Sequence, residues 1–267
     1  MLEHARITAS SGARPHASAA APGAIAVAMA RISGLVLALS SLLAWGQAPL
    51  LAPLSGPGDK PPAPWTVYTL PRQTKPVTQF TIASIDGRRA LRIDANESYG
   101  SLGHRLPPDS TPGHLLAWRW RIDQPIPKAD LRERSGDDTA VKVCALFDEP
   151  LDKLPTLDRV WMKATHAATG AEMPAASVCY VWDSHLAAGT ILANAFTNRV
   201  RYIVLRSGDA PLSTWEEEKR NLDADFLRLF GEEVDVVPRL VGIMIGGDAD
   251  NTHSHSLAWV ADLTLAP

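Results

Sequence analysis

Residues 116–122 of the chain read LAWRWRI, and the order of these side chains predicts a β-strand. Tryptophan and arginine alternate at Trp118, Arg119, Trp120 and Arg121. Successive side chains of a strand point to opposite faces, so both indoles share one face and both guanidinium groups share the other. A buried face opposite a solvated face is typical of an antiparallel sheet that covers a core on one side. The stretch therefore predicts a half-buried strand in a layered β structure.

The same period of two recurs along the chain. VKVCALF at residues 141–147 alternates in this way, and Asp86-Gly87 separates two apolar runs in IDGRRALRI, which is a strong hairpin signal. Short apolar runs divided by turn residues predict further strands. The predicted strands are Trp65–Leu70, Phe80–Ile85, Ala90–Asp94, Leu115–Ile122, Ala140–Phe147, Ser177–Trp182, Val200–Leu205, Leu240–Ile245 and Leu257–Leu265.

One amphipathic helix is predicted near residues 214–230. Ser213 and Glu216 have the spacing of a capping box, and Gly231 supplies a stop signal. Many short strands with one late helix predict an antiparallel β-sandwich of the jelly-roll type, in a single domain over residues 65–267. An open α+β layer is the alternative. The apolar stripe of the predicted helix consists of Trp215, Leu222, Phe226 and Leu229.

The first 48 residues are predicted to be an N-terminal extension with a secretory signal. Arg31 precedes the apolar run Ile32–Trp45, and small residues allow cleavage after Ala48. The run is shorter than the ~20 residues of a membrane-spanning helix, although an uncleaved anchor is the alternative. Residues 49–64, rich in proline, glycine and leucine, are predicted to be a linker. We therefore expect a periplasmic or secreted protein with no membrane span after cleavage.

Charge and cysteine content limit the function. The net charge of −3 over 267 residues disfavours nucleic-acid binding, which requires a basic surface. The two cysteines, Cys144 and Cys179, lie in separate predicted strands. An oxidising compartment permits a disulfide between them, whereas two buried thiols are the alternative. No Cys-x-x-Cys pair indicates a zinc or thioredoxin-type redox site.

Six motifs occur in order along the chain: LAWRWRI, PKADLRERSGDD, YVWDS, the W-x4-RN of residues 215–221, LFGEE and DADNT. As a set they resemble the bacterial secreted family called domain of unknown function 3047, over about Trp65–Leu265. DGRRALRI followed by a tryptophan-rich strand, with AWVADLTL near the C-terminus, also looks like galactose-binding-type jelly rolls. Carbohydrate-binding modules share that layout. The resemblance implies a jelly roll and implies no particular reaction.

The loop GGDADNTHSHS, at residues 246–256, is a candidate metal site. Asp248, Asp250 and Asn251 supply the oxygen ligands that Ca²⁺ prefers, although the EF-hand pattern does not fit. The jelly-roll resemblance implies Asp262, in the last predicted strand, as a further ligand. The alternative is a polar turn whose side chains bond to their own backbone.

Asp137 and Asp138 form a second candidate site. Adjacent carboxylates repel, so one of them can hold a proton near neutral pH and act as an acid, as glycoside hydrolysis requires. In a binding module the same groups bind sugar hydroxyls. The alternative is a Gly-Asp turn that faces Arg132 or Arg134.

Tyr180 and Trp182 are candidate ligand-binding aromatics. They share one face of a predicted strand, and a polar Asp-Ser-His sequence follows them. Sugars stack on flat rings, so these two are predicted as exposed exceptions among aromatic residues that mostly belong to the core. Arg220 and Asn221, on the predicted helix, would reach the same rim; a solvated helix face is the alternative.

Three functions follow from these patterns. The leading hypothesis is a secreted, non-enzymatic module that binds a carbohydrate or envelope glycan, with structural calcium. The second is a hydrolase of the glycoside type that uses Asp137 or Asp138 with the loop at 248–251. The third is a structural envelope protein that binds another protein. The first two require residues 136–138 and 248–251 to meet at one end of the sandwich.

Overall fold

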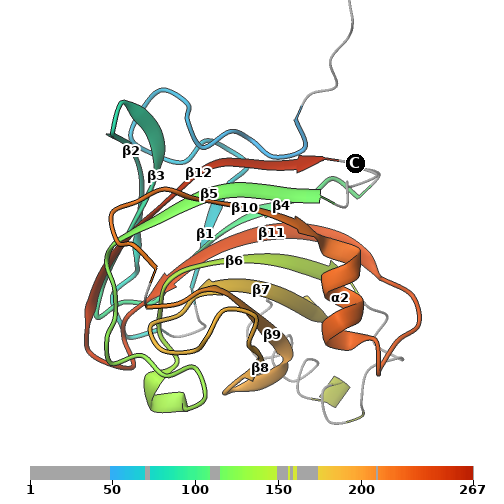
Figure 1. Cartoon of the computed structure of the whole chain (residues 1–267). Helices are drawn as coiled ribbons and strands as arrows, with labels where there is room; N and C mark the ends of the chain where they lie inside the picture. Colours follow the sequence, from blue (N-terminus) through green and yellow to red (C-terminus); the bar gives the residue numbers. More distant parts are fainter. Residues whose placement is uncertain are drawn as a thin grey trace, which may run out of the picture. The chain divides into compact units, whose positions relative to one another are not determined.

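The computed structural model of the chain contains two packed β-sheets, so the predicted β-sandwich is confirmed (Figure 1). The structure describes residues 49–69, 73–108, 115–148, 156, 159–160, 174–208 and 210–266. The chain divides into two compact units, Met1–Gly46 and Gln47–Pro267, and the sandwich belongs to the second. The predicted secretory signal at residues 1–48 lies outside the described residues.

Within the described residues, one sheet has seven strands and the other has five. Neighbouring strands run antiparallel, except that β7 and β9 are parallel. The first sheet has the order β1 (Thr66–Tyr68), β4 (Ser101–Arg105), β11 (Arg239–Asp248), β6 (Thr139–Asp148), β7 (Ala176–Trp182), β9 (Thr197–Arg206), β8 (Ile191–Asn194). The second has the order β10 (Glu216–Asn221), β5 (Leu115–Gln124), β12 (His255–Ala266), β3 (Arg88–Asn96), β2 (Gln79–Ile85).

The strands predicted from the period of two are present, whereas β4, β8 and β10 were not predicted. The Asp86-Gly87 hairpin joins β2 to β3, with both turn residues at positive φ, as a tight turn of this kind requires. In β5, Trp118 and Trp120 are buried, and Arg119 and Arg121 lie on the other face. The alternation at residues 116–122 therefore identifies the inward face of the sheet correctly.

Aromatic side chains fill the space between the two sheets. The ring of Trp118 lies 5.2 Å from that of Tyr180, and the ring of Trp120 lies 5.9 Å from that of Trp182. Each contact joins β5 of one sheet to β7 of the other. On the opposite face of the seven-stranded sheet, Cys144 and Cys179 stand opposite each other in β6 and β7 and form a disulfide.

The predicted helix is present only in its second half. Residues 216–221 form strand β10, which pairs with β5, and the helix α2 spans Leu222–Phe230. The capping box at Ser213 was therefore wrong, and Asn221 is the N-cap, its side chain accepting a hydrogen bond from the backbone of Ala224. The helix buries Phe226 and Phe230 at one end of the sandwich (Figure 1).

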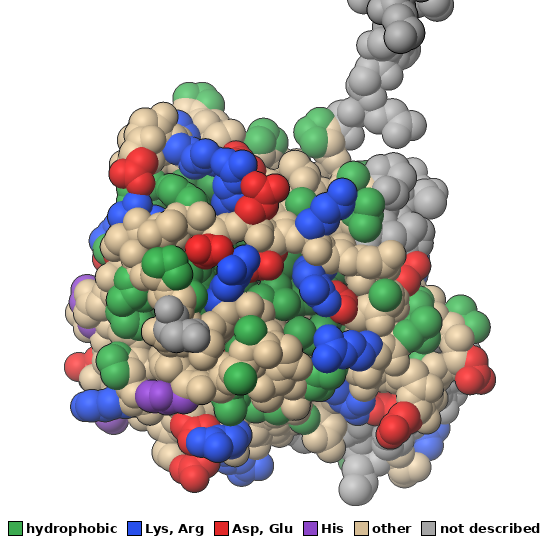
Figure 2. Space-filling view, in the orientation of Figure 1, with side chains coloured by type: hydrophobic (Ala, Val, Ile, Leu, Met, Phe, Trp, Pro, Cys, Tyr) green, Lys and Arg blue, Asp and Glu red, His purple; other side chains and the backbone are tan. Residues whose placement is uncertain are grey.

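Residues 49–64, which we predicted to be a linker, contain no strand or helix. Leu51 and Leu54 are nevertheless buried in the main core, and the backbone N–H of Ala52 donates to Nε2 of His104 at 3.1 Å. No helix in the described part of the chain combines the length and the apolar character needed to span a membrane. Figure 2 shows basic and acidic side chains interspersed on the viewed face, not gathered into one basic patch.

Candidate functional site

The acidic loops at residues 136–138 and 248–251 meet at one end of the sandwich, as the functional hypotheses require. Strands β6 and β11 are antiparallel neighbours, so the start of β6 lies beside the end of β11, with Thr139 opposite Asp248. The carboxylate of Asp138 accepts hydrogen bonds from the backbone N–H of Asn251 at 3.2 Å and of Thr252 at 2.7 Å. The hydroxyl of Thr252 donates to the same carboxylate at 2.6 Å. Asp138 therefore joins the two loops.

Asp248 is held in a buried ion pair. Its Oδ2 accepts a hydrogen bond from Nζ of Lys142 at 2.8 Å, and its Oδ1 accepts from the backbone N–H and the hydroxyl of Thr139, both at 2.9 Å. Burial lowers the pKa of Lys142, but the Asp248 carboxylate, together with Tyr202, Tyr99 and Asp137, holds that pKa well above its usual value. Lys142 is therefore charged, and both oxygens of Asp248 have partners from the chain.

Asp137 belongs to a separate buried network. Its carboxylate accepts hydrogen bonds from Nδ2 of Asn194 at 2.6 Å and from the hydroxyl of Tyr202 at 3.4 Å. Burial raises the pKa of Asp137, and the nearby Asp248 carboxylate adds to the effect. Tyr202 packs with the disulfide on the outer face of the seven-stranded sheet. Adjacent residues Asp137 and Asp138 thus have different surroundings.

The four predicted calcium ligands do not form one set. Asp250 and Asn251 lie in the loop beside Asp138. Burial raises the pKa of Asp250, and repulsion from the carboxylates of Asp138 and Asp248 raises it further. Asp262 lies seven residues beyond the start of β12, roughly 20 Å along the strand, and pairs with Arg88. The described residues contain no group of three or more His, Cys, Asp or Glu side chains placed to hold a metal. Calcium binding stays a prediction.

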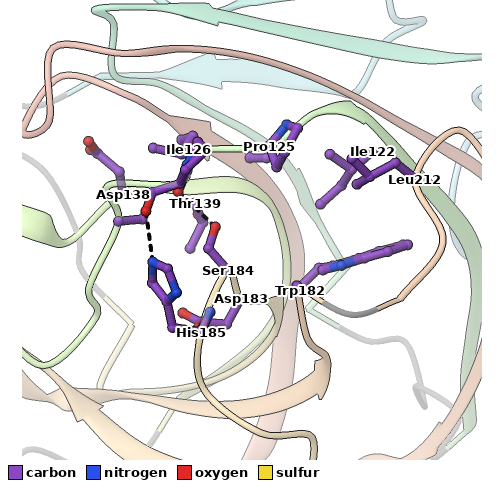
Figure 3. Close-up of a pocket in the computed structure, with 14 residues that line it drawn as sticks. Ile122, Pro125, Ile126, Asp138, Thr139, Trp182, Asp183, Ser184, His185 and Leu212 are labelled. Atoms are coloured by element: carbon purple, nitrogen blue, oxygen red, sulfur yellow. Dashed lines mark hydrogen bonds between the residues drawn. The ribbon is translucent and has the colours of Figure 1, made fainter.

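A pocket of about 180 Å³ opens beside Asp138 (Figure 3). Its walls come from the segment that follows β5, the start of β6, the end of β7 and the segment that precedes β10. Figure 3 shows Trp182, Ile122 and Leu212 on one side, and Asp138, Ser184 and His185 on the other. The pocket lining therefore combines apolar and polar residues, and Ile126 lies beside Asp138 (Figure 3).

Two hydrogen bonds join the segments that form the polar side. The hydroxyl of Ser184 donates to the carbonyl oxygen of Ile126 at 2.7 Å, and Nε2 of His185 lies 2.7 Å from the carbonyl oxygen of Pro127. A carbonyl only accepts, so Nε2 of His185 carries the hydrogen in this contact. These bonds keep the segment after β5 against the end of β7 and so maintain the opening of the pocket.

Asp183 is among the residues that line the pocket and is only 2% exposed. Its Oδ1 accepts hydrogen bonds from the backbone N–H groups of His185, at 2.7 Å, and Leu186. Asp183 therefore stabilises the turn that follows β7.

A sequence model of the family described as protein of unknown function, DUF3047, matches residues 63–264. The chain belongs to the DUF3047 family. No curated protein matches the sequence of this DUF3047 chain.

Among solved structures, the DUF3047 chain is similar to the family 30 carbohydrate-binding module of a cellulosomal cellulase from Clostridium thermocellum, with 12% identity and a TM-score of 0.32 over 80% of this chain and 92% of that one. It is similar to a β-1,2-glucanase from Parabacteroides distasonis, with 10% identity and a TM-score of 0.30 over 77% of this chain and 22% of that one. It is also similar to the xyloglucanase domain of NopAA, a type three effector from Sinorhizobium fredii in complex with cellobiose. There the identity is 7% and the TM-score 0.29, over 76% of this chain and 98% of that one.

The residues predicted to bind a ligand fall into three places in the DUF3047 domain. Asp138 and Trp182 line the pocket, and Asp137 lies in the network with Tyr202. Tyr180 is fully buried and Trp182 is only 3% exposed, so the prediction of two exposed rings was wrong. The hydroxyl of Tyr180 donates to Asp225 at 2.8 Å. The remaining two predicted residues also have structural partners.

Arg220 donates from Nε to the carboxylate of Asp225 at 2.8 Å, and its guanidinium lies 5.6 Å from the ring centre of Tyr180. Asn221 caps α2. Both residues lie on or next to β10 and not on the predicted helix, so the expected helical rim does not exist. The structure places neither residue among those that line the pocket.

Sequence reasoning missed Asp183, His185 and Leu212 as pocket residues of the DUF3047 domain. The signal that could have found the first two is the polar sequence after the buried strand end YVW, because strand ends commonly carry binding groups on their loops. Leu212 had no such signal. It lies in a segment that we had assigned only as the approach to a helix.

Proposed function

We propose that this DUF3047 domain is an exported, non-enzymatic module that binds carbohydrate in the pocket beside Trp182. The observation that carries the proposal is the mixed lining of that pocket, which contains apolar and polar residues. Ligand pockets combine a mostly apolar wall with a few polar groups that orient the ligand. A sugar ring has a C–H face that packs on apolar side chains and hydroxyl groups that hydrogen-bond to polar groups, and residues of both kinds line the pocket.

The hydrogen-bond partners of the acidic residues support binding over hydrolysis. Both oxygens of Asp138 already accept hydrogen bonds from the loop at residues 251–252, and both oxygens of Asp248 have chain donors. A general acid or base must reach the proton that it transfers. Asp137 has the raised pKa of a general acid, but it bonds to Asn194 and is not among the pocket residues.

Export is supported by two features of different kinds. The apolar run Ile32–Trp45 has the length of a signal segment, and Cys144 and Cys179 form a disulfide. Disulfides persist in oxidising compartments such as the periplasm and are rare in the cytosol. N-terminal sequencing of protein recovered from the periplasmic or extracellular fraction tests this part, with Pro49 expected as the first residue. Recovery from the cytosol with the segment intact would contradict it.

A glycan array followed by isothermal titration calorimetry tests binding. Leu212, 43% exposed at the pocket, is changed to Ala, and Leu227, 42% exposed on α2, is changed to Ala as the matched control. Loss of about 1 kcal/mol of apolar contact predicts a roughly fivefold weaker affinity for Leu212→Ala. Leu227→Ala should bind as the unmodified protein does. The proposal fails if no carbohydrate binds, or if the two variants change the affinity equally.

A reducing-end assay separates binding from hydrolysis. Each carbohydrate that binds is incubated with the protein, and release of new reducing ends is measured over time against Asp137→Asn and Asp138→Asn variants. We expect no release by any of the three proteins. If the unmodified protein releases reducing ends and one of the folded variants does not, the protein is a hydrolase and the binding proposal is wrong.

A further inference from the structure

We propose that residues 49–65 form a strap along one side of the sandwich, and that protonation of His104 releases this strap in mild acid. The inference concerns a part of the molecule other than the pocket beside Trp182, and it does not depend on carbohydrate binding. It rests on the hydrogen bond that His104 accepts, on the burial of its ring and on the contacts of the strap.

The strap makes hydrogen bonds to both sheets. On the seven-stranded sheet, the backbone N–H of Ala52 donates to Nε2 of His104 in β4 at 3.1 Å. On the five-stranded sheet, the carbonyl oxygen of Asp59 accepts from the backbone N–H of Ile82 in β2 at 2.8 Å. The guanidinium of Arg89 in β3 donates to two further carbonyl oxygens of the strap. The strap therefore connects the two sheets, and the bond to His104 is its polar contact with β4.

Apolar side chains of the strap complete the core beside His104. Leu51 and Leu54 belong to the main core between the sheets. Trp65, at the end of the strap, is buried, and its ring centre lies 5.0 Å from that of His104. Nε1 of Trp65 donates to the carbonyl oxygen of Ala52 at 2.8 Å, which holds the two ends of the strap together. Release of the strap would therefore expose three large apolar side chains.

The docked strap requires a neutral His104. A ring nitrogen that accepts a hydrogen bond carries a lone pair and no hydrogen, so Nε2 is unprotonated in the contact with Ala52. The single hydrogen of the neutral ring is therefore on Nδ1. This nitrogen is buried, and none of the described atoms forms a hydrogen bond with it. The geometry thus assigns one charge state and one tautomer to the docked form.

A charged His104 is incompatible with the docked strap. The proton would join Nε2 and face the N–H of Ala52, so that two donors would meet and the hydrogen bond would be lost. The charge would also be buried, because His104 is only 4% exposed and shares its face of β4 with Leu102 and Leu106. A buried charge without a partner is costly. Displacement of the strap admits water to the ring and removes both costs.

Charged side chains around the strap do not change this conclusion. The charged and titratable side chains on the elements packed around it are Asp59 and Lys60 of the strap, Tyr68 of β1, Arg105 of β4, Arg239 and Asp248 of β11, and Arg88, Arg89, Arg92 and Asp94 of β3. Burial lowers the pKa of His104, backbone groups of His104 and Arg105 offset the effect only in part, and none of these charged side chains contributes. Burial therefore controls the proton affinity of this ring.

The direction of the pH effect follows from these two states. With the strap released, His104 is in water and has its ordinary pKa of about 6.5, whereas burial lowers that pKa in the docked form. Above pH 6.5 both forms hold a neutral ring, so docking is independent of pH. Below pH 6.5 only the released form takes up the proton, until the docked ring is protonated as well. In that range the equilibrium constant for release rises by up to about tenfold per pH unit.

Hydrogen exchange measured by mass spectrometry between pH 5 and 8 tests the inference. Rates for peptides that cover residues 49–65 are divided by the intrinsic rates at each pH, which gives the protection of the strap. We expect constant protection between pH 7 and 8 and a loss of at least about threefold between pH 6.5 and 5. Peptides from the central strand β6 should keep their protection over the whole range.

Two histidine variants show whether His104 is responsible. His104→Gln keeps an acceptor oxygen for the N–H of Ala52 and cannot be protonated in this pH range, so its strap protection should be independent of pH. His253→Gln removes an exposed histidine that pairs with Glu97, and this matched control should keep the pH dependence of the unmodified protein. If His104→Gln does not fold, nitrogen NMR of the unmodified protein labelled at histidine takes its place. The ring of His104 should then become charged over the pH range in which the strap loses protection.

Four results would overturn the inference. The first is strap protection that is independent of pH in the unmodified protein, and the second is a pH dependence that survives in His104→Gln or that proceeds while the ring stays neutral. The third is protection that rises in acid, because the indole of Trp65 would then stabilise the charged ring. The fourth is a simultaneous loss of protection in the strap and in β6, since acid would then unfold the whole domain.

Discussion

Replacing Asp248 by Asn should destabilise the protein strongly, because Asp248 neutralises a lysine whose side chain is only 11% exposed. The Nζ of Lys142 lies 2.8 Å from Oδ2 of Asp248, and both side chains are buried. In Asp248→Asn the amide oxygen still accepts the two hydrogen bonds from Thr139, so the shape of the site is kept. The amide nitrogen then faces the ammonium group, and the buried charge loses its partner.

The cost follows from the burial of the pair. Removing one partner of a buried ion pair typically costs about 3–5 kcal/mol, since the remaining charge stays in a medium that solvates it poorly. For a domain of this size that corresponds to a melting temperature lower by roughly 6–20 °C. Urea denaturation, with the slope of the transition checked for constancy, measures the free energy of unfolding directly.

A double-mutant cycle with Lys142→Met shows whether loss of the Lys142–Asp248 ion pair causes the loss of stability in Asp248→Asn. Met keeps the unbranched length of the lysine chain and removes the charge, so the double variant has no unpaired ion. It should lose about 2–3 kcal/mol less than the sum of the two single variants. Asp148→Asn breaks the exposed ion pair with Arg239 and is the matched control, with an expected cost below about 1 kcal/mol. A cost of Asp248→Asn as small as that of the control, or additive single effects, would refute the reasoning.

Three further predictions concern stability. Asn221→Ala should lower the free energy of unfolding, measured by urea denaturation, by about 1 kcal/mol, because α2 loses its N-cap. Asn221→Asp should keep the stability of the unmodified protein. An Asn221→Ala variant of unchanged stability but lower ligand affinity would contradict this and indicate that Asn221 binds the ligand. Burial raises the pKa of Asp137 above its ordinary 3.8, so the folded state binds the proton more strongly than the unfolded chain, and the stability of the unmodified protein relative to Asp137→Asn should fall as pH rises above about 4. A relative stability that is independent of pH contradicts this. Calcium at residues 248–251 predicts a melting temperature that rises with added Ca²⁺ and falls with chelator, and a temperature insensitive to both contradicts it.

The local pattern of the sequence predicted the faces of the strands. The alternation of Trp118 and Trp120 with arginines identified the buried side of β5, and Asp86-Gly87 located a hairpin. Both features depend only on the period of the extended backbone and on the conformations that a two-residue turn demands. Both predictions could therefore be made without knowing which residues pack on the other side of the core. The six linked motifs likewise indicated the family from the sequence alone.

Residues 216–221 show where such local reasoning stopped. Their spacing fitted a helix, yet they form β10, because Glu216 and Glu218 lie opposite Trp120 and Trp118 of β5. Glu218 accepts hydrogen bonds from Nε1 of Trp120 and from Nε of Arg206, which a helix at this position would not provide. Cross-strand partners therefore outweighed the local helical pattern.

The sequence by itself determined the buried side of β5, and the functional hypotheses drawn from it required two acidic loops to share one end of the sandwich. Only the tertiary structure decided that Asp138 bonds to the second loop and that Asp248 neutralises Lys142. The physical reason is that a carboxylate takes its role from the donors around it, and here those donors come from segments more than a hundred residues away in the chain.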